Sequence, residues 1–144
     1  MKWIQEEDGR VVLSLERGET LRENVESVAA ELGFKAAKVS AIGALEDPEL
    51  GCYELDDREY IHRTFDGIWE LLSLEGNISL LDGEPFLHAH CSISGHDFKV
   101  LGGHLFDAKV GVVVEMFIEP FDTPLPRIPC EAIGLPRWEP GEEA

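Results

Sequence analysis

One amphipathic helical pattern in an otherwise strand-rich chain is the feature that most limits the folds open to this sequence. The segment ETLRENVESVAAELGF (residues 19–34) repeats apolar residues on one helical face: Leu21, Val25, Val28, Ala29 and Leu32. Glu19 and Glu23 suit the positive end of the helix dipole, and Gly33 is well placed to end the helix. No other segment carries a convincing long helix, so we expect one main helix in the fold.

The other apolar segments have the alternating or continuous apolar character of β-strands. Strands are expected over residues 10–16, 36–43, 49–55, 58–65, 67–81, 86–94 and in two stretches within 98–121. Turns are expected at Asp47-Pro48, at Asp82-Gly83 and around Gly95-His96, with a kink at Gly76 and an interruption at Gly102-Gly103. The sequence therefore predicts an α+β fold, in which one main helix packs on a largely antiparallel sheet.

The C-terminal segment is rich in proline. Six of the eight prolines, at positions 120, 124, 126, 129, 136 and 140, exclude regular structure and predict a Pro-rich C-terminal extension. Apolar residues continue to Leu135, so we expect a single domain over residues 1–135 on which this extension packs. Residues 136–144 are expected to form a frayed acidic tail.

The charge of the chain limits the partners that it can bind. The net charge of -17 repels phosphate backbones, and the 12 basic residues form no run, so direct nucleic-acid binding is not expected. No apolar run approaches the roughly 18 residues of a membrane span, and the N-terminus lacks the apolar stretch of a signal peptide. Three widely separated cysteines form no disulfide framework, so we expect a cytoplasmic protein.

Four of the five histidines lie between residues 84 and 104, in EPFLHAHCSISGHDFKVLGGH. Alternate residues of a strand share a face, so Phe86, His88 and His90 lie on one side and Cys91 on the other. Two imidazoles at i and i+2 sit roughly 6 to 7 Å apart at the backbone, a separation that lets both reach one ion. If the chain turns near Gly95-His96, their partner on the next strand falls within residues 101–105.

His104 lies in that window, so His88, His90 and His104 form a candidate three-histidine metal site. Zinc held in this way keeps a fourth coordination position open, and neutral imidazole also suits other divalent transition metals. The neighbouring glycines would let the backbone approach closely without crowding the site. The alternative is that the histidines are ordinary polar residues on an exposed or interfacial sheet face.

Other candidate residues are weaker. His96 is expected in the turn and His62 on a surface strand, while Cys91 points away from the histidines. Asp82 and Asp107 are expected in turns.

Two carboxylates interrupt apolar strands, Glu70 and Glu115. Each could be a solvated residue on the outer face of the sheet, or a partner that orients a ligand imidazole or acts as a base.

The chain lacks the marks of several catalytic classes. A cupin also carries His-x-His on a strand, but it needs a glutamate three or four residues later, where this chain has Ser94 and Gly95. There is no GxSxG segment, no P-loop and no GxGxxG after a strand.

Three segments make the chain similar to the stand-alone prokaryotic PPC domain (plants and prokaryotes conserved). They are VSAIGALEDPELGCYE (39–54), WELLSLEGNISLLDGEPFLHAH (69–90) and VLGGHLFDAKVGVVVEMFIE (100–119), in the order and spacing of the family. The resemblance implies an antiparallel sheet with a packed helix, assembled as a homotrimer. It also implies that the histidines of prokaryotic members bind metal, carried here onto His88, His90 and His104.

The resemblance supplies no settled activity. In plants the domain follows AT-hooks, short Arg-Gly-Arg-Pro segments that enter the DNA minor groove, and no such segment occurs here. Our first hypothesis is a metal-binding homotrimer, with zinc as the expected metal, that binds a small ligand or a protein partner. The other two are a zinc-dependent hydrolase or lyase and a DNA-associated transcriptional regulator.

Overall fold

The computed structural model describes residues 1–140. Its elements in chain order are β1 (Lys2–Gln5), β2 (Val11–Glu16), α1 (Leu21–Glu31), β3 (Ala37–Glu54), β4 (Glu59–Thr64), β5 (Ile68–Leu81), β6 (Glu84–Ser94), β7 (Val100–Pro120), β8 (Arg127–Cys130) and β9 (Leu135–Trp138). Every strand pairing is antiparallel except one isolated bridge, so the predicted antiparallel sheet with a single main helix is observed. No helix in the described residues is long and apolar enough to cross a membrane.

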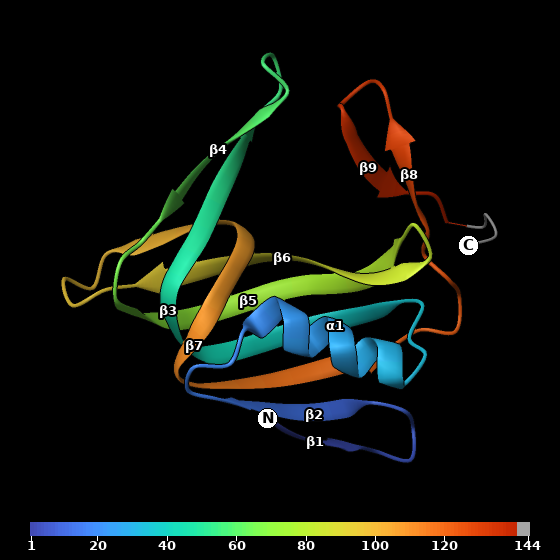
Figure 1. Ribbon diagram of the computed structural model, residues 1–144, viewed down its shortest axis with the longest axis horizontal. Coiled ribbons are helices and arrows are strands. Elements are labelled where there is room, and N and C mark those ends of the chain that lie inside the picture. Colours follow the sequence, from blue (N-terminus) through green and yellow to red (C-terminus); the bar gives the residue numbers. More distant parts are fainter. Residues whose placement is uncertain (141–144) are drawn as a thin grey trace.

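Four strands close on one another to form a ring. β7 pairs with β6, β6 with β5, β5 with β3, and β3 again with β7. β2 and β1 extend this sheet beside β7, and β4 pairs with the far end of β3 (Figure 1). The ring is possible because β3 and β7 are long and strongly curved, so that different parts of each strand pair with different neighbours.

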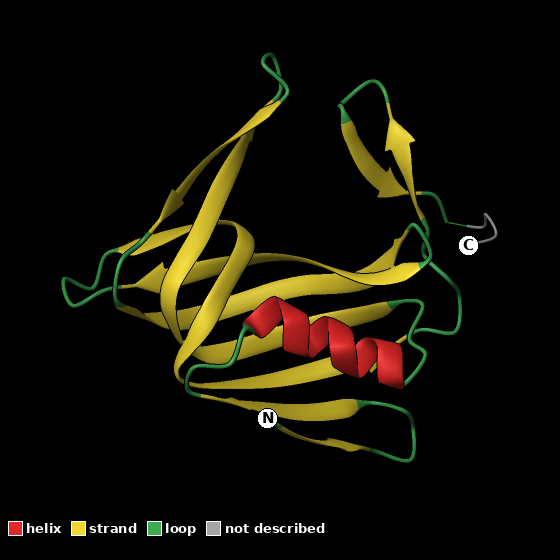
Figure 2. Ribbon diagram, viewed as in Figure 1, coloured by secondary structure: helices red, strands yellow, loops and turns green. Residues whose placement is uncertain are grey.

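Helix α1 lies across the sheet and closes the core (Figure 2). It begins after Thr20, whose backbone is extended, and it ends before Gly33, whose φ of 68° confirms this glycine as the helix stop. The helix buries four of the five residues predicted on its apolar face: Leu21, Val25, Val28 and Ala29. They pack against inward side chains of the strands, including Leu13, Leu45, Leu74, Ile78, Leu87, Ile93, Leu105, Met116 and Ile118.

Three of the strand breaks expected from the sequence are wrong. β3 continues through Gly43 and through Asp47-Pro48 to Glu54, and β7 continues through Gly102-Gly103. In β3 the expected breaks are irregularities of register, at Gly43 and between Glu46 and Leu50, and Asp47 has a positive φ of 49°. Bulges of this kind bend a strand without ending it, which is the curvature that a closed ring needs.

The β5–β6 hairpin is as predicted at its turn but not along its length. Asp82 and Gly83 both have positive φ, as a tight two-residue hairpin requires. The irregularity of β5 lies between Leu71 and Ser73 rather than at Gly76. Gly76 has a different role, because a Cβ there would lie 2.5 Å from the backbone oxygen of His88.

The proline-rich segment is more regular than predicted. It forms the β8–β9 hairpin, in which Pro129 and Pro136 face each other, so both missing N–H groups fall at one point of the ladder. The segment packs on β5, where the Leu80 N–H donates to the Leu125 carbonyl at 2.9 Å. Residues 136–138 of the expected tail lie in β9, and residues 141–144 are outside the described residues.

Candidate metal centre

The three predicted histidines come together at the junction of β6 and β7. His90 and His104 are direct register partners, which confirms the position that the turn around Gly95-His96 predicted. His88 follows on the same face of β6, and ring centroids in the cluster lie 5.1 to 5.5 Å apart. One nitrogen of each imidazole lies within 4.8 Å of the others, close enough for the three to hold one ion.

Two glycines let β7 carry His104 into this position. At Gly102 a Cβ would lie 2.6 Å from the Cys91 carbonyl oxygen of β6, and at Gly103 it would lie 2.6 Å from the Gly51 oxygen of β3. Neither position can hold a side chain without moving the backbone, because β7 passes here from pairing with β6 to pairing with β3. The sequence pair Gly102-Gly103 is therefore a crossing point rather than a strand end.

Burial sets the protonation state of the inner two imidazoles. Desolvation, reinforced by the charge of Arg127 and by the neighbouring histidines, lowers the pKa of His88 to about 4. Desolvation, followed by the effects of His90, Arg22 and Arg127, lowers the pKa of His104 to about 4 as well. Both rings are therefore neutral at neutral pH, the state in which imidazole binds a metal.

His104 also carries a ring nitrogen without a partner. Its Nδ1 is buried and has no hydrogen-bond partner among residues 1–140. Buried polar atoms are rarely left without a partner, so this nitrogen is free for a hydrogen-bonding ligand or an ion. Together with the neutral rings and the all-imidazole donor set, it shows that the residues present fit a zinc-type metal.

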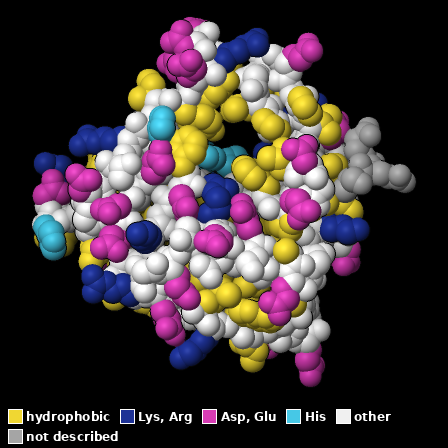
Figure 3. All heavy atoms as spheres, viewed as in Figure 1, with side chains coloured by type: hydrophobic (Ala, Val, Ile, Leu, Met, Phe, Trp, Pro, Cys, Tyr) yellow, Lys and Arg dark blue, Asp and Glu magenta, His cyan; other side chains and the backbone are white. Residues whose placement is uncertain are grey.

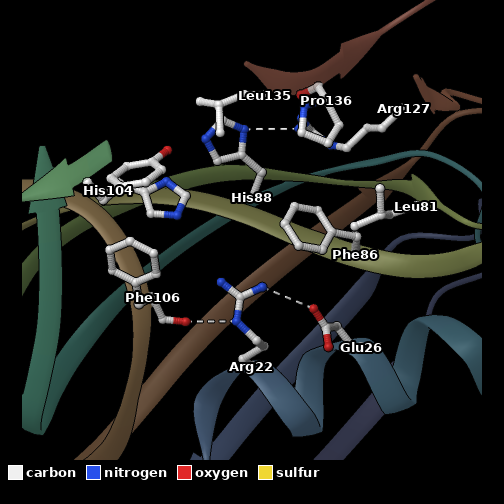
Figure 4. Close-up of a pocket in the computed structure, with 11 residues that line it drawn as sticks. Arg22, Glu26, Leu81, Phe86, His88, His104, Phe106, Arg127, Leu135 and Pro136 are labelled. Carbon is white, nitrogen blue, oxygen red and sulfur yellow. Dashed lines mark hydrogen bonds and ion pairs between the residues drawn. The ribbon is translucent and has the colours of Figure 1, made fainter. Parts of the chain in front are cut away.

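A cavity of about 520 Å³ opens beside the cluster. In Figure 4, His88 and His104 lie along one side of it, Phe86 and Phe106 form further walls, and Arg22 lies at its base. Its remaining lining comes from Glu26, Tyr60, Leu81, Arg127, Leu135 and Pro136. Figure 3 shows the molecule hollowed below the two arms formed by β3–β4 and β8–β9, with histidine side chains visible beside the opening.

The cavity exists because β6 and β7 part after His104. Their pairing stops at His90 and His104, and from His104 onward β7 pairs with β3. Arg22 fills the gap: its guanidinium donates to the Leu87, Leu105 and Phe106 carbonyls. Glu26 accepts from the Leu87 N–H and pairs with Arg22, so two helix side chains replace the missing strand ladder.

The two arms meet above the cavity. The Tyr53 hydroxyl at the far end of β3 donates to the Ile133 carbonyl in the β8–β9 turn, at 2.7 Å. Below this contact, the Tyr60 ring of β4 lies 5.1 Å from His104 and 4.9 Å from Phe106. The aromatic wall therefore places low-polarity surface directly beside the imidazoles.

Arg127 extends from β8 to the histidine cluster. Its Nε donates to Ser79 Oγ at 2.7 Å, and one Nη2 proton is directed at His88 Nδ1 at 3.0 Å. Further bonds reach Asn77 Oδ1 and the Pro136 carbonyl. All four partners are uncharged, and burial lowers the pKa of this guanidinium from its ordinary value.

The weaker histidine and cysteine candidates lie outside the cluster. His62 is exposed on β4 and pairs with Glu49, while His96 lies in the turn between β6 and β7. Cys91 faces the core, as its strand parity predicts, and burial raises the pKa of its thiol to about 11. Asp107 is not a turn residue as expected: it lies within β7 and accepts from the Arg22 backbone N–H.

Glu70 and Glu115 do not line the cavity. Both are exposed on the outer sheet face, where Glu70 borders a shallow hollow with Ile42 and Leu72. Glu115 borders a second hollow with Phe117. Among residues 1–140 the one carboxylate that lines the cavity is Glu26, which is held by Arg22 and the Leu87 N–H. Glu75 of β5 is the register partner of His90, but it does not line the cavity, so among the described residues the cavity itself presents no carboxylate free to act as a base.

Sequence reasoning missed the cationic and aromatic part of the site. Strand parity did place Phe86 on the face of His88, but without a role in the site. Arg22 carries a signal: a cation in the first turn of a helix is electrostatically unfavourable, which indicates a use elsewhere. Arg127 gives no such signal, since it stands in a proline-rich segment without periodicity.

A family model matches most of the chain. Residues 5–122 match the Plants and Prokaryotes Conserved (PCC) domain, a range that contains all three histidines. No curated protein matches the chain significantly.

Solved structures share the fold. A plant- and prokaryote-conserved protein from Pyrococcus horikoshii is 32% identical, with a TM-score of 0.85 over 96% of this chain and 94% of that one. A metal-containing protein from Archaeoglobus fulgidus is 36% identical, with a TM-score of 0.86 over 96% of this chain and 99% of that one. A Bacteroides thetaiotaomicron protein whose name proposes DNA binding is 22% identical, with a TM-score of 0.90 and 96% coverage of each chain.

Proposed function

This chain belongs to the Plants and Prokaryotes Conserved domain family, and from that premise we propose that it is a metal-binding domain whose His88, His90 and His104 hold one zinc ion. The observation that carries the proposal is the convergence of three imidazole nitrogens within 4.8 Å of one another. Three imidazole nitrogen donors without a thiolate or carboxylate suit zinc, and also other divalent transition metals. A similar protein from Archaeoglobus fulgidus, 36% identical, is described as metal-containing, which supports the same interpretation.

The chemistry of such a centre follows from its donor set. If His88, His90 and His104 hold zinc, the ion would supply Lewis-acid chemistry and could take water or a ligand as a further partner. The residues of this chain contribute a half-enclosed cavity beside His88 and His104, bounded by Phe86, Phe106 and Tyr60. The carboxylate that lines the cavity is committed to Arg22, so binding of a small ligand or a partner group is better supported than hydrolysis or elimination.

We propose further that the domain is a homotrimer. Apolar side chains gather on the sheet face that the helix leaves uncovered: Val12, Ile42, Leu72, Val112 and Phe117, which are 40 to 60% exposed. Val12 and Phe117 are register partners, and Ile42 borders the hollows that contain Phe117 and Val112. A contiguous exposed apolar face of this kind is typical of a subunit interface.

The proposal does not include direct DNA binding. The chain carries 29 acidic and 12 basic residues, and nucleic-acid binding depends on cations that replace phosphate counterions. The relative whose name proposes DNA binding is 22% identical, so its likeness concerns the fold. A gel shift at low salt, where electrostatic attraction is strongest, should show no retarded DNA.

Metal analysis tests the function. Protein purified without chelator and without a histidine tag should contain about one metal ion per chain, zinc being expected. His88→Ala and His104→Ala should each remove most of it, because two imidazoles hold zinc far more weakly than three.

The matched control for the metal analysis is His96→Ala, which removes a histidine from the exposed turn between β6 and β7. This variant should have the same metal content as the wild type. A wild-type content below about 0.2 ions per chain would contradict the proposal, and so would equal loss of metal in His96→Ala.

A further inference from the structure

We propose that the cavity beside the histidine cluster binds a small organic carboxylate with an apolar or aromatic body, and that Arg127 anchors its carboxylate. This inference rests on the proposed function only in taking His88, His90 and His104 as the metal site.

Arg127 is a cation without a counter-ion inside a half-enclosed site. Among residues 1–140, no carboxylate forms an ion pair with it, and its four hydrogen-bond partners are all neutral. Leaving a partly buried charge uncompensated is costly, so such a group favours an anion. One Nη1 proton also has no partner among the described residues, which leaves a donor for that anion.

Arg22, unlike Arg127, is a cation whose charge is already compensated. It lines the same cavity, but Glu26 compensates its charge, and three backbone carbonyls accept its protons. The charged side chains that line the cavity are Arg22, Arg127 and Glu26, so they sum to one positive charge in a chain of net charge -17. This local sign reversal matches a singly charged anion, and Arg127 is the cation available to bind it.

The hydrogen bond from Arg127 to His88 links the anchor to the metal site. A neutral imidazole has one lone-pair nitrogen, which can accept a hydrogen bond from Arg127 or bind a metal, but not both. Arg127 occupies this lone pair at His88 Nδ1. Metal binding at His88 therefore releases an Arg127 N–H beside the open side of the cluster, where a carboxylate oxygen can accept it.

The walls of the cavity specify the rest of the ligand. Phe86 lies under both cations, with its ring centroid 5.4 Å from Arg22 Cζ and 5.3 Å from Arg127 Cζ. Phe106, Tyr60 and Leu81 add further apolar surface, and a volume of about 520 Å³ accommodates a small molecule. An aromatic or branched aliphatic body with one carboxylate satisfies both the walls and the cation.

Calorimetric titration with 3-phenylpropionate and with its neutral amide tests the proposal on wild-type protein. The acid should bind at least about tenfold more tightly than the amide, because the amide cannot compensate the guanidinium. Protein loaded with zinc should bind the acid more tightly than protein treated with EDTA, since the metal releases an Arg127 N–H.

Variants identify the anchor. Arg127→Gln should lower the affinity for the acid at least about tenfold and leave that for the amide nearly unchanged, whereas Arg127→Lys should lie between Arg127→Gln and wild type. The matched control is Arg137→Gln, which removes the same charge from an exposed arginine of β9 and should bind the acid like wild type. Circular dichroism checks that each variant is folded.

The outcomes separate this proposal from the metal proposal. Equal affinity of wild-type protein for acid and amide, or no saturable binding of the acid at millimolar concentration, overturns the carboxylate site. Undiminished acid binding by folded Arg127→Gln overturns the anchor. Metal content measured on the same samples reports on the histidines alone, so an acid preference in metal-free protein would uphold the anion site even if zinc binding failed.

Discussion

At His88 and His104, burial determines charge. Both rings lie between the strand junction and an apolar cavity wall, so water stabilises their protonated forms poorly. The nearby guanidiniums of Arg22 and Arg127 oppose protonation further. These two histidines thus stay unprotonated, and able to bind a cation, at pH values at which an exposed imidazole is partly protonated.

These lowered pKa values predict a pH dependence of stability for the metal-free protein. An unfolded histidine binds a proton below about pH 6.5, whereas folded His88 and His104 resist it until about pH 4. The unfolded state therefore binds more protons in this window, and the free energy of unfolding should fall as the pH falls from 6.5 to 4. Urea denaturation after EDTA treatment measures this dependence.

Paired variants isolate the contribution of the two rings. In His88→Gln the free energy of unfolding should fall less across the same window, because one of the two resisting groups is gone. His96→Gln, changed in the exposed turn, should follow the wild type. An identical slope in wild type and His88→Gln would show that His88 titrates like an unfolded residue.

At this scale the sequence predicts the convergence of the three histidines well and the rest of the cavity poorly. Strand parity and a short turn suffice to bring His88, His90 and His104 together, since both act over neighbouring residues. Arg127 reaches His88 from a segment 39 positions away. That contact depends on how the β8–β9 hairpin packs on β5, which no local pattern encodes.

At the scale of elements, the divergence of β6 from β7 is both the origin of the cavity and a weak point of the fold. The strand ladder stops where backbone groups are still part-buried, and α1 supplies replacements from Arg22 and Glu26. The helix therefore holds the two strands apart at a fixed separation while it covers the core.

Loss of the hydrogen bonds by which Arg22 and Glu26 bridge β6 and β7 should destabilise the fold. Arg22→Met keeps the apolar stem but leaves three carbonyls without donors and Glu26 without a cation, so it should lower the free energy of unfolding by about 2 to 4 kcal/mol. Arg22→Lys should recover part of this, since a single ammonium cannot reproduce the fork of the guanidinium. Chemical denaturation monitored by circular dichroism gives the values.

The control for this prediction is Arg10→Met, because Arg10 makes an exposed ion pair with Asp8. Exposed ion pairs contribute little, so this variant should unfold like wild type. If Arg22→Met were no less stable than Arg10→Met, the bridge would have no role in holding β6 and β7.

The helix and the central strands were predictable in type, whereas β1, β8 and β9 and the lengths of β3 and β7 were not. The helix, the Asp82-Gly83 hairpin and the strand that carries His88 follow from periodicity and turn chemistry. β3 and β7 were expected to break at Gly43 and at Gly102-Gly103, because glycine usually marks an end. Here these glycines permit close passage of neighbouring backbones, a requirement that arises only once the ring closes.

At the scale of the whole molecule, one sheet face remains without a cover. The helix protects the inner side, but Val12, Ile42 and Phe117 lie together on the outer side. The segment VGVVVEMF (residues 110–117) is apolar on both strand parities, so it needs more burial than one helix supplies. The sequence did not predict the closed ring, because pairing of β3 with β7 depends on the bends of both strands.

Phe117→Asp should prevent assembly if this face joins the subunits, because it places a charge in the apolar interface. Light scattering of the wild type should give about 48 kDa, three times the 16.0 kDa chain, and the variant should approach 16.0 kDa. Phe98→Asp is the matched control, as Phe98 is 87% exposed in the β6–β7 turn, and it should remain trimeric. A wild-type mass of 16.0 kDa would contradict the trimer.

The central claim is that three histidines from two strands form one metal centre. Anomalous diffraction at the zinc absorption edge, on crystals grown without chelator, tests it most directly. We predict a single strong peak about 2.0 to 2.1 Å from one nitrogen of each of His88, His90 and His104, with Arg127 displaced from the His88 lone pair. Absence of a peak between these imidazoles, or a peak bound by other residues, would contradict it.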